Sequence, residues 1–174
     1  YGIERRLAQC APDLHSRYRD CVIISQRMLC RYENYFPDFT DHTVLHTLDI
    51  VELCNQLIGD QVEKLSAEDL YVLLMGALFH DVGMGVSISD FEQFRAVLGF
   101  PEPADDNARA WAVRDHHQEL SGLYLEKYWR MLDFPNEAYV KAVIQVCRGH
   151  RKTNILDAKN YPPQFEVEPG KTVS

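Results

Sequence analysis

Ala77-Leu78-Phe79-His80-Asp81-Val82-Gly83 joins an apolar run to an adjacent His-Asp pair and then to a glycine. The apolar run extends back to Leu70 and covers nearly every side of a helix, so we predict that this helix is buried at the centre of the fold. Burying His80 beside Asp81 would cost free energy unless a partner satisfied both side chains. Imidazole and carboxylate are both ligands of divalent cations. The stretch therefore predicts a central helix that ends at a metal site. The alternative is a helix end with a histidine near the helix dipole and an aspartate that starts a turn.

Helical periodicity recurs along the chain, whereas no strand-like alternation persists. This pattern predicts an all-α fold with helices over about 12–31, 41–58, 67–79, 89–99, 107–131 (one helix or a broken pair) and 134–148. Ser66–Asp69 is close to a capping box for the central helix, and Ser89–Glu92 is typical of one for the next helix, which Gly99 ends. We expect stretch 100–106 to be a loop over the site, and the tail after Thr153 to be a loop or an extended linker.

Length and composition are those of one globular domain over residues 1–174, with 46% apolar and 25% charged residues. The net charge of -8 argues against nucleic-acid binding as the main purpose. No apolar run approaches the about 20 residues of a membrane span, and Tyr1–Arg6 is too polar to be a signal peptide. The five cysteines form no CxxC pair, which fits reduced thiols. We therefore expect a cytoplasmic protein with neither a membrane nor a nucleic-acid partner.

The histidines extend the metal-site hypothesis beyond the His-Asp pair. His42 and His46 lie four residues apart, so they share one face of a predicted helix, but no glutamate base lies between them as in metalloproteases. In the pair His116–His117, one ring can face inward while the other faces out. His150 follows an apolar helix, as His80 does. Taken singly, each could be an ordinary surface or helix-end histidine.

Four motifs follow one another along the chain: His46-Thr47-Leu48-Asp49, then Leu78-Phe79-His80-Asp81-Val82-Gly83, then His117-Gln118-Glu119, and last Arg148-Gly149-His150. In this order they resemble the HD-domain superfamily of metal-dependent phosphohydrolases, and within it most closely the HD-CE type. The resemblance covers about residues 36–162. It implies an HD-domain-like helical bundle with a metal site between helices, which hydrolyses a nucleotide or another phosphate ester.

The resemblance also assigns roles to the matching residues. His46 corresponds to the first metal ligand, and His80 and Asp81 to the paired ligands, with Asp81 able to bridge two ions. His117 and His150 match the extra histidines of two-metal members, which hold a second ion or contact the phosphate. Asp81 and His117 are accordingly the candidate catalytic residues, and His117 could instead donate a proton to the leaving oxygen. The ligands suit one or two ions of Mn, Fe, Mg or Zn.

Basic residues near these motifs could neutralise the substrate's phosphate charge. Arg114 and Arg148 are the candidate substrate-binding residues, and Arg151 lies close by in the sequence. Ordinary surface charge is the alternative for each, and for Lys152 it is the interpretation that we prefer.

One departure from the family pattern affects the functional prediction. The pattern closes with an aspartate on a later helix, and Asp157 lies in the wrong context for that role. We expect the closing helix to lie beyond Ser174, because the tail stops where that helix would be expected. The first residue is not Met, so we also expect a longer parent protein with further domains. The alternative function is a catalytically inactive HD-type sensor of nucleotide or metal that regulates a larger protein. A helical interaction domain without metal is a third interpretation.

Overall fold

The computed structural model describes residues 2–29, 44–150, 155–159 and 161–174. Their elements are α1 (Gly2–Cys10), α2 (Pro12–Leu29), α3 (Val44–Ile58), η2 (Gly59–Lys64), α4 (Ala67–Phe79), η3 (Val82–Gly85), α5 (Ile88–Leu98), α6 (Asp106–Tyr128), α7 (Glu137–Gly149), β1 (Phe165–Glu168) and β2 (Lys171–Val173). The predicted all-α bundle is confirmed, with a small hairpin added to it. The expected start of α3 near residue 41 and the end of α2 at Arg31 lie outside the described residues.

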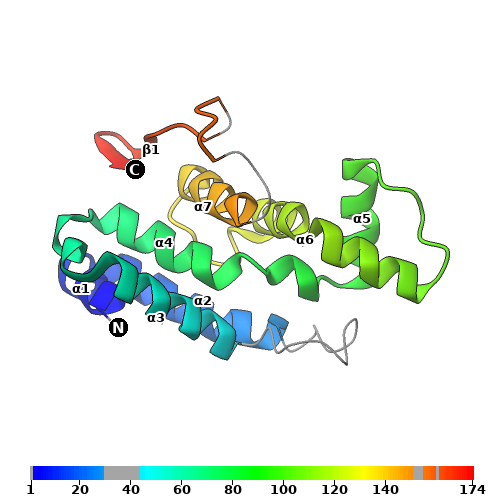
Figure 1. Ribbon diagram of the computed structural model, residues 1–174, viewed down its shortest axis with the longest axis horizontal. Helices are drawn as coiled ribbons and strands as arrows, with labels where there is room; N and C mark the ends of the chain where they lie inside the picture. The colour runs from blue at the N-terminus through cyan, green and yellow to red at the C-terminus, as the bar shows by residue number, and fades with distance from the viewer. Residues whose placement is uncertain (1, 30–43, 151–154, 160) are drawn as a thin grey trace.

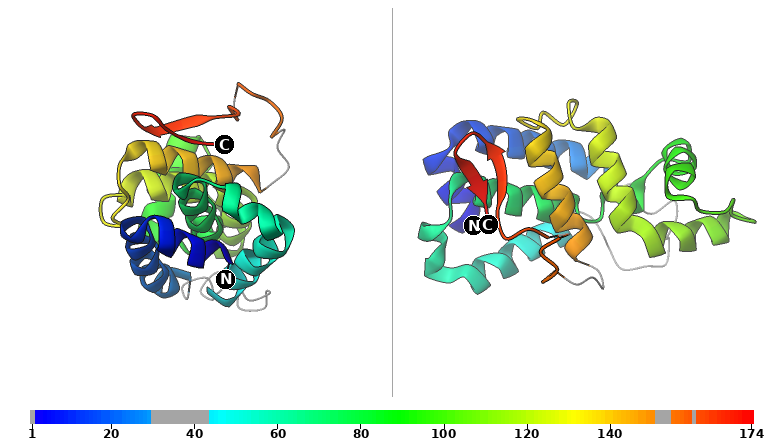
Figure 2. Two further views of the ribbon diagram at one scale, coloured as in Figure 1. Left: turned by 90° about the vertical axis from the view of Figure 1, so that its left-hand side faces the viewer. Right: turned by 90° about the horizontal axis from the view of Figure 1, so that it is seen from above.

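Helix α4 is the central helix, as its apolar sequence predicts (Figures 1 and 2). Helices α1, α2 and α3 pack against one side of α4, and α7 packs against another, while α6 contacts η3 just after α4 ends. Ser66 and Asp69 form the predicted capping box, in which each side chain accepts a hydrogen bond from the other residue's backbone N–H. The polar first turn and the apolar remainder thus start α4 at the surface and carry it into the core.

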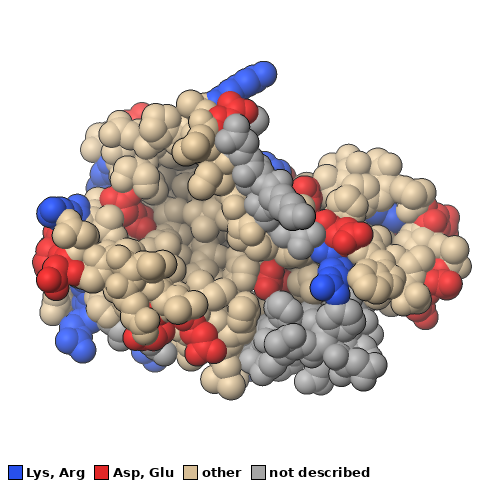
Figure 3. Space-filling view, in the orientation of Figure 1, with Lys and Arg blue, Asp and Glu red and all other residues tan. Residues whose placement is uncertain are grey.

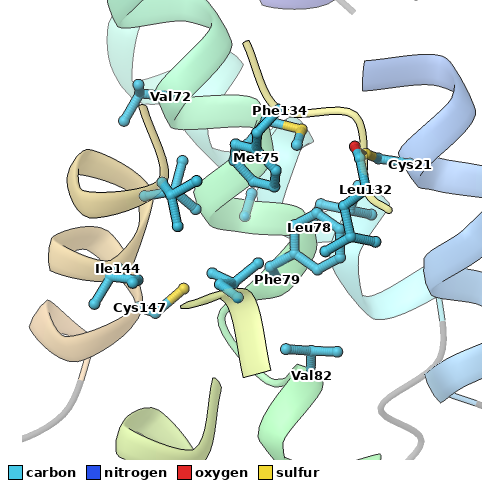
Figure 4. Packing of buried hydrophobic residues seen from close by; sticks show 14 of the residues in the cluster. Cys21, Val72, Met75, Leu78, Phe79, Val82, Leu132, Phe134, Ile144 and Cys147 are labelled. Carbon is cyan, nitrogen blue, oxygen red and sulfur yellow. Dashed lines mark hydrogen bonds between the residues drawn. The ribbon is translucent and has the colours of Figure 1, made fainter. Parts of the chain in front are cut away.

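The core around α4 draws large side chains from distant parts of the sequence (Figure 4). Phe79 is fully buried and its ring lies 6.1 Å from that of Phe134, which precedes α7. Tyr71 and Tyr139 join α4 to α7 through an edge-on contact at 5.5 Å. Burial of these aromatic rings fixes the position of the end of α4, where His80 and Asp81 follow.

Helix α6 is broken at His116, whose backbone angles (φ -122°, ψ 15°) are not helical. The sequence was compatible with either one helix or a broken pair over this range. The structure has two helical segments joined at a kink. Asp105 caps the start of α6 by accepting a hydrogen bond from the Ala108 N–H at 2.7 Å. The kink lies directly before His117 and therefore helps to set the direction of that side chain.

Two local predictions were wrong, and one helix was missed. The N-terminal helix α1 was not predicted, because only Ile3 and Leu7 give it a buried face. The cap of α5 is Ser87, whose Oγ accepts from the Asp90 N–H, and not Ser89. The tail after Thr153 is not wholly a loop or linker, since β1 and β2 pair as an antiparallel hairpin.

The hairpin is attached to the two helices beneath it, and this attachment explains why its short strands were missed. The carbonyl of Val167 in β1 accepts a hydrogen bond from Asn136, the N-cap residue of α7, at 3.0 Å. Lys171 in β2 pairs with Glu68 of α4 at 3.4 Å. These tertiary contacts leave no periodic pattern in the sequence of a strand only three or four residues long.

The buried carboxylate of Asp90 joins α5 to α6. Asp90 accepts hydrogen bonds from Lys127 and Tyr128 on one oxygen and from Ser87 on the other, each at 2.7 Å. Burial by itself raises the pKa of Asp90, but these three donors together lower it below its ordinary value. The ionised form is therefore favoured in the folded protein.

We predict that Asp90→Asn lowers the melting temperature by a few degrees at neutral pH. Because the pKa of Asp90 is lower in the folded than in the unfolded state, its contribution is complete above the unfolded pKa of about 3.9 and disappears as the pH falls through the folded value. Thermal melts from pH 3 to pH 7 should show the two proteins converging at the acid end. Glu102→Gln, at an exposed carboxyl, is the control. An equal difference at all pH values would contradict this account.

Surface charge is mixed on the face shown in Figure 3, where acidic and basic side chains alternate around a broad uncharged area. In the described parts of the chain, no single helix is both long and apolar enough to cross a membrane. A bent pair, residues 67–85 with 88–98, meets the length and composition criteria together but turns by 99° between its two halves.

Candidate metal centre

Asp81 lies at the centre of a cluster of four histidines. Its Oδ2 is 3.1 Å from the Nε2 of His80 and 4.0 Å from that of His46. Its Oδ1 is 3.2 Å from the Nε2 of His117 and 3.6 Å from that of His150. The structure thus brings together all five residues that the sequence suggested as metal ligands, from α3, the end of α4, α6 and the end of α7.

These residues form two ligand groups that share one carboxylate. The first group is His46, His80 and Asp81, and the second is Asp81, His117 and His150. Within each group the candidate ligand atoms all lie within 4.8 Å of one another. The two oxygens of Asp81 face different groups, which is the arrangement of a carboxylate that can bridge two ions.

Backbone carbonyls orient three of the imidazole rings. The Nδ1 of His80 donates to the Ala77 carbonyl at 2.8 Å, and that of His117 donates to the Arg114 carbonyl at 2.6 Å. The Nδ1 of His150 makes the same contact with the carbonyl three residues earlier. Each acceptor lies in the last turn of a helix or beside the kink of α6, where carbonyls lose intrahelical donors. A proton held on Nδ1 leaves Nε2 with its lone pair, which is the form that binds a metal.

The donor set fits a divalent cation. The Nε2 atoms of His117 and His150 lie 2.8 Å apart, and with both Nδ1 atoms donating to carbonyls, two lone pairs face each other. Two lone pairs at this distance repel unless a positive charge lies between or beside them. Three buried polar side chains converge here, since His80, Asp81 and His117 are each no more than 9% exposed. A cation satisfies all of these groups together.

Burial and charge act differently on the two histidines at the helix ends. Burial lowers the pKa of His80, but the hydrogen bond and charge of Asp81 outweigh it, so the net pKa is raised. For His150, burial dominates and its pKa is lowered. Burial also raises the pKa of the Cys147 thiol, which stays protonated, and Cys147 belongs to neither ligand group of the described residues.

His116 has its own contact beside the cluster. Its ring packs on that of Phe100 with the centroids 3.9 Å apart, and it belongs to neither ligand group of the described residues. Of the His116–His117 pair, His117 is therefore the one that joins the candidate ligands. The loop 100–105 therefore contacts α6 immediately before His117. His42, Arg151 and Lys152 lie outside the described residues.

The two arginines suggested for phosphate binding have different surroundings. Arg114 lies one turn before His117, and its guanidinium is 5.4 Å from the ring centroid of Trp111. Arg148 packs along α6, where a Cβ added at Gly122 would lie 3.6 Å from its Nη2. The guanidinium of Arg114 therefore lies beside a half-exposed tryptophan, whereas Arg148 lies at the contact between α6 and α7.

Sequence analysis missed a connection between α4 and α6. The hydroxyl of Ser121 donates to the His80 carbonyl at 2.9 Å and accepts from the Gly83 N–H at 2.8 Å. In the sequence, Ser121 and Gly122 form a pair of small residues, which by itself indicates only that this helix can pack closely. Its position four residues after His117, on the same face of α6, was the available signal, but the partner groups are backbone atoms that no residue pattern identifies.

Comparison with known proteins gives one match. The HD-CE family model matches residues 36–173, so the match begins where the resemblance in the sequence begins and continues through the hairpin. Neither the curated proteins nor the solved structures searched contain a match to this chain.

Proposed function

The chain belongs to the HD-CE family, and on this basis we propose that it is a metal-dependent phosphohydrolase of nucleotides or other phosphate esters. The observation that carries the proposal is the position of Asp81, whose two oxygens face two groups of histidine ligands. A carboxylate between two cation positions is typical of sites that hold both the attacking and the leaving oxygen of a phosphoryl group.

We propose two ions, one in each ligand group, with Asp81 bridging them. Four imidazoles and one carboxylate favour Zn, Fe or Mn over Mg, which prefers oxygen ligands and retains its water. Divalent ions here would polarise a phosphoryl oxygen and lower the pKa of a bound water. The chain's contribution is to direct the Nε2 atoms of His80, His117 and His150 toward the ions through the Nδ1–carbonyl bonds and to hold Asp81 between the groups.

His117 is assigned here as a ligand and not as a proton donor. Its Nδ1 is bound to the Arg114 carbonyl and its Nε2 faces Asp81 and His150. Both ring nitrogens are therefore engaged, and neither is directed at a leaving group. The proton for the leaving oxygen would then come from water.

Arg114 and Trp111 are proposed to recognise the substrate next to the ions. Arg114 lies three residues before His117, on the other side of the kink, and its carbonyl accepts the hydrogen bond from the His117 Nδ1 at 2.6 Å. A guanidinium there can form charge-assisted hydrogen bonds with a phosphate. Trp111 is 50% exposed and offers an aromatic face on which a base can stack.

We predict that Arg114→Ala raises KM by about 10-fold, the size of one lost charge-assisted hydrogen bond. Metal content should stay unchanged, because the group that orients His117 is the backbone carbonyl, which alanine retains. Steady-state kinetics together with elemental analysis separate the two effects. Arg130→Ala, at an exposed arginine after α6, is the matched control. A loss of bound metal in Arg114→Ala would contradict the assignment.

The proposed activity is tested by phosphate release from nucleoside mono-, di- and triphosphates and from p-nitrophenyl phosphate, with Mn²⁺, Zn²⁺ or Fe²⁺ added. Turnover that depends on the metal and is lost in Asp81→Asn supports the proposal. Full metal loading without turnover of any substrate contradicts it and favours the sensor function. No metal binding at all favours a helical interaction domain.

A further inference from the structure

We propose that Ser121 is a positioning residue that fixes the positions of the two metal-ligand groups relative to each other. This inference rests on the proposed metal centre, and it concerns a side chain that touches neither a candidate ion position nor the substrate. The geometry behind it lies where α4, η3 and α6 meet.

The end of α4 leaves backbone groups without helical partners. The helix ends at Phe79, and His80 and Asp81 follow before η3 begins at Val82. At such a break, the last carbonyls and the first N–H groups of the next turn need other partners. The Asp81 carbonyl obtains one within the turn, from the Met84 N–H at 2.9 Å. The His80 carbonyl and the Gly83 N–H obtain theirs from Ser121.

A single hydroxyl can serve both groups because it donates once and accepts at the same time. Ser121 has no solvent exposure, so water cannot replace either bond. The backbone of one ligand, His80, is thus tied to α6, the helix that carries another ligand, His117, four residues before Ser121. Because His80 and Asp81 are adjacent, the tie also sets where the bridging carboxylate lies relative to His117.

Close packing at Gly83 makes the tie stiff. A Cβ at Gly83 would lie 2.1 Å from the His117 carbonyl oxygen, so the backbones of η3 and α6 are in direct contact. The hydroxyl of Ser121 and the absent side chain of Gly83 together fix the distance between the end of α4 and α6. The group formed by Asp81, His117 and His150 spans this junction, whereas His46 reaches Asp81 from α3, on the other side.

The two groups should therefore respond differently to loss of the hydroxyl. We expect Ser121→Ala to weaken the ion held by Asp81, His117 and His150 by about 10- to 100-fold, the range for partners that orient metal ligands. The ion held by His46, His80 and Asp81 should change much less. Titration calorimetry with Mn²⁺ or Zn²⁺ alone measures both, and the His46→Ala background isolates the weakened ion.

Ser25→Ala is the matched control. Ser25 is also fully buried, but its hydroxyl donates to the Val22 carbonyl of its own helix. Both alanine variants should lose some thermal stability, and only Ser121→Ala should lose metal affinity. Ser121→Thr, which keeps the hydroxyl, should restore affinity, and Ser121→Cys is a second loss variant of similar size if the alanine variant does not fold.

Equal metal affinity in Ser121→Ala and wild type, at the same loss of melting temperature as in Ser25→Ala, would overturn the proposal. The outcome is separable from that of the proposed function. A wild-type protein that binds metal without hydrolysing any phosphate ester removes the function and leaves the role of Ser121 intact. Normal hydrolysis by the wild type, together with unaltered metal binding in Ser121→Ala, supports the function and removes the role of Ser121.

Discussion

Asp81→Asn is expected to remove metal from both ligand groups at once and to reduce phosphate release by on the order of 10³-fold or more. Loss of a single electrostatic stabiliser at a reaction centre costs about 10²–10³-fold, and Asp81 serves both groups through its two oxygens. The amide keeps the shape of the carboxylate but not its charge. Elemental analysis of the purified variant and steady-state kinetics provide the measurements.

Comparison with the histidine variants tests the bridging role directly. His46→Ala should lose one ion and His150→Ala the other, because each belongs to only one group. Asp115→Asn, at an exposed carboxylate two residues before His117, is the control for a charge change nearby. If Asp81→Asn lost only one ion, the shared carboxylate would not be a bridge.

Gly83→Ala is expected to destabilise the fold and to abolish metal binding. The added Cβ would lie 2.1 Å from the His117 carbonyl oxygen and 2.7 Å from the Ser121 nitrogen. Both are backbone atoms, so relief requires η3, which directly follows Asp81, and α6 to move apart. Overpacking of this kind costs about 1–3 kcal/mol or more, and the movement would separate Asp81 from His117. Chemical denaturation and metal titration measure the two effects.

Gly122→Ala is the matched control for this substitution. Gly122 lies on the same helix as His117, but a Cβ there would first meet the side chain of Ile144, at 3.3 Å. A side-chain methyl can shift by a few tenths of an ångström, so the cost should be small and metal binding should persist. Wild-type metal affinity in Gly83→Ala would show that the close approach does not position the ligands.

The sequence predicted much of the fold because its main helices carry strong local signals. The apolar run before His80 predicted a buried central helix, and the structure buries α4 between its neighbours. The capping box at Ser66 was predicted because both of its hydrogen bonds lie within four residues. The short elements were not predicted because they lack such local signals. Helix α1 and the hairpin depend on contacts with α4 and α7, which are distant from them in the sequence.

The candidate ligands were also available from the sequence, as residue types in a family order. The grouping of these ligands around Asp81 was not available from the sequence. Which oxygen of Asp81 faces which histidine depends on how α3, α6 and α7 pack around the end of α4. Arg114 and Arg148 were equivalent in the sequence, but one lies beside Trp111 and the other over Gly122.

The sequence by itself determined the central helix, the His-Asp pair at its end and the set of histidines that could join them. These follow from local chemistry, because apolar periodicity and ligand type are properties of the residues themselves. Only the tertiary structure decided that Asp81 is shared, that Ser121 ties α4 to α6, and that Gly83 must lack a side chain. These depend on distances between backbone groups of separate helices, and such distances are fixed by the packing of the whole core and not by any single stretch of the chain.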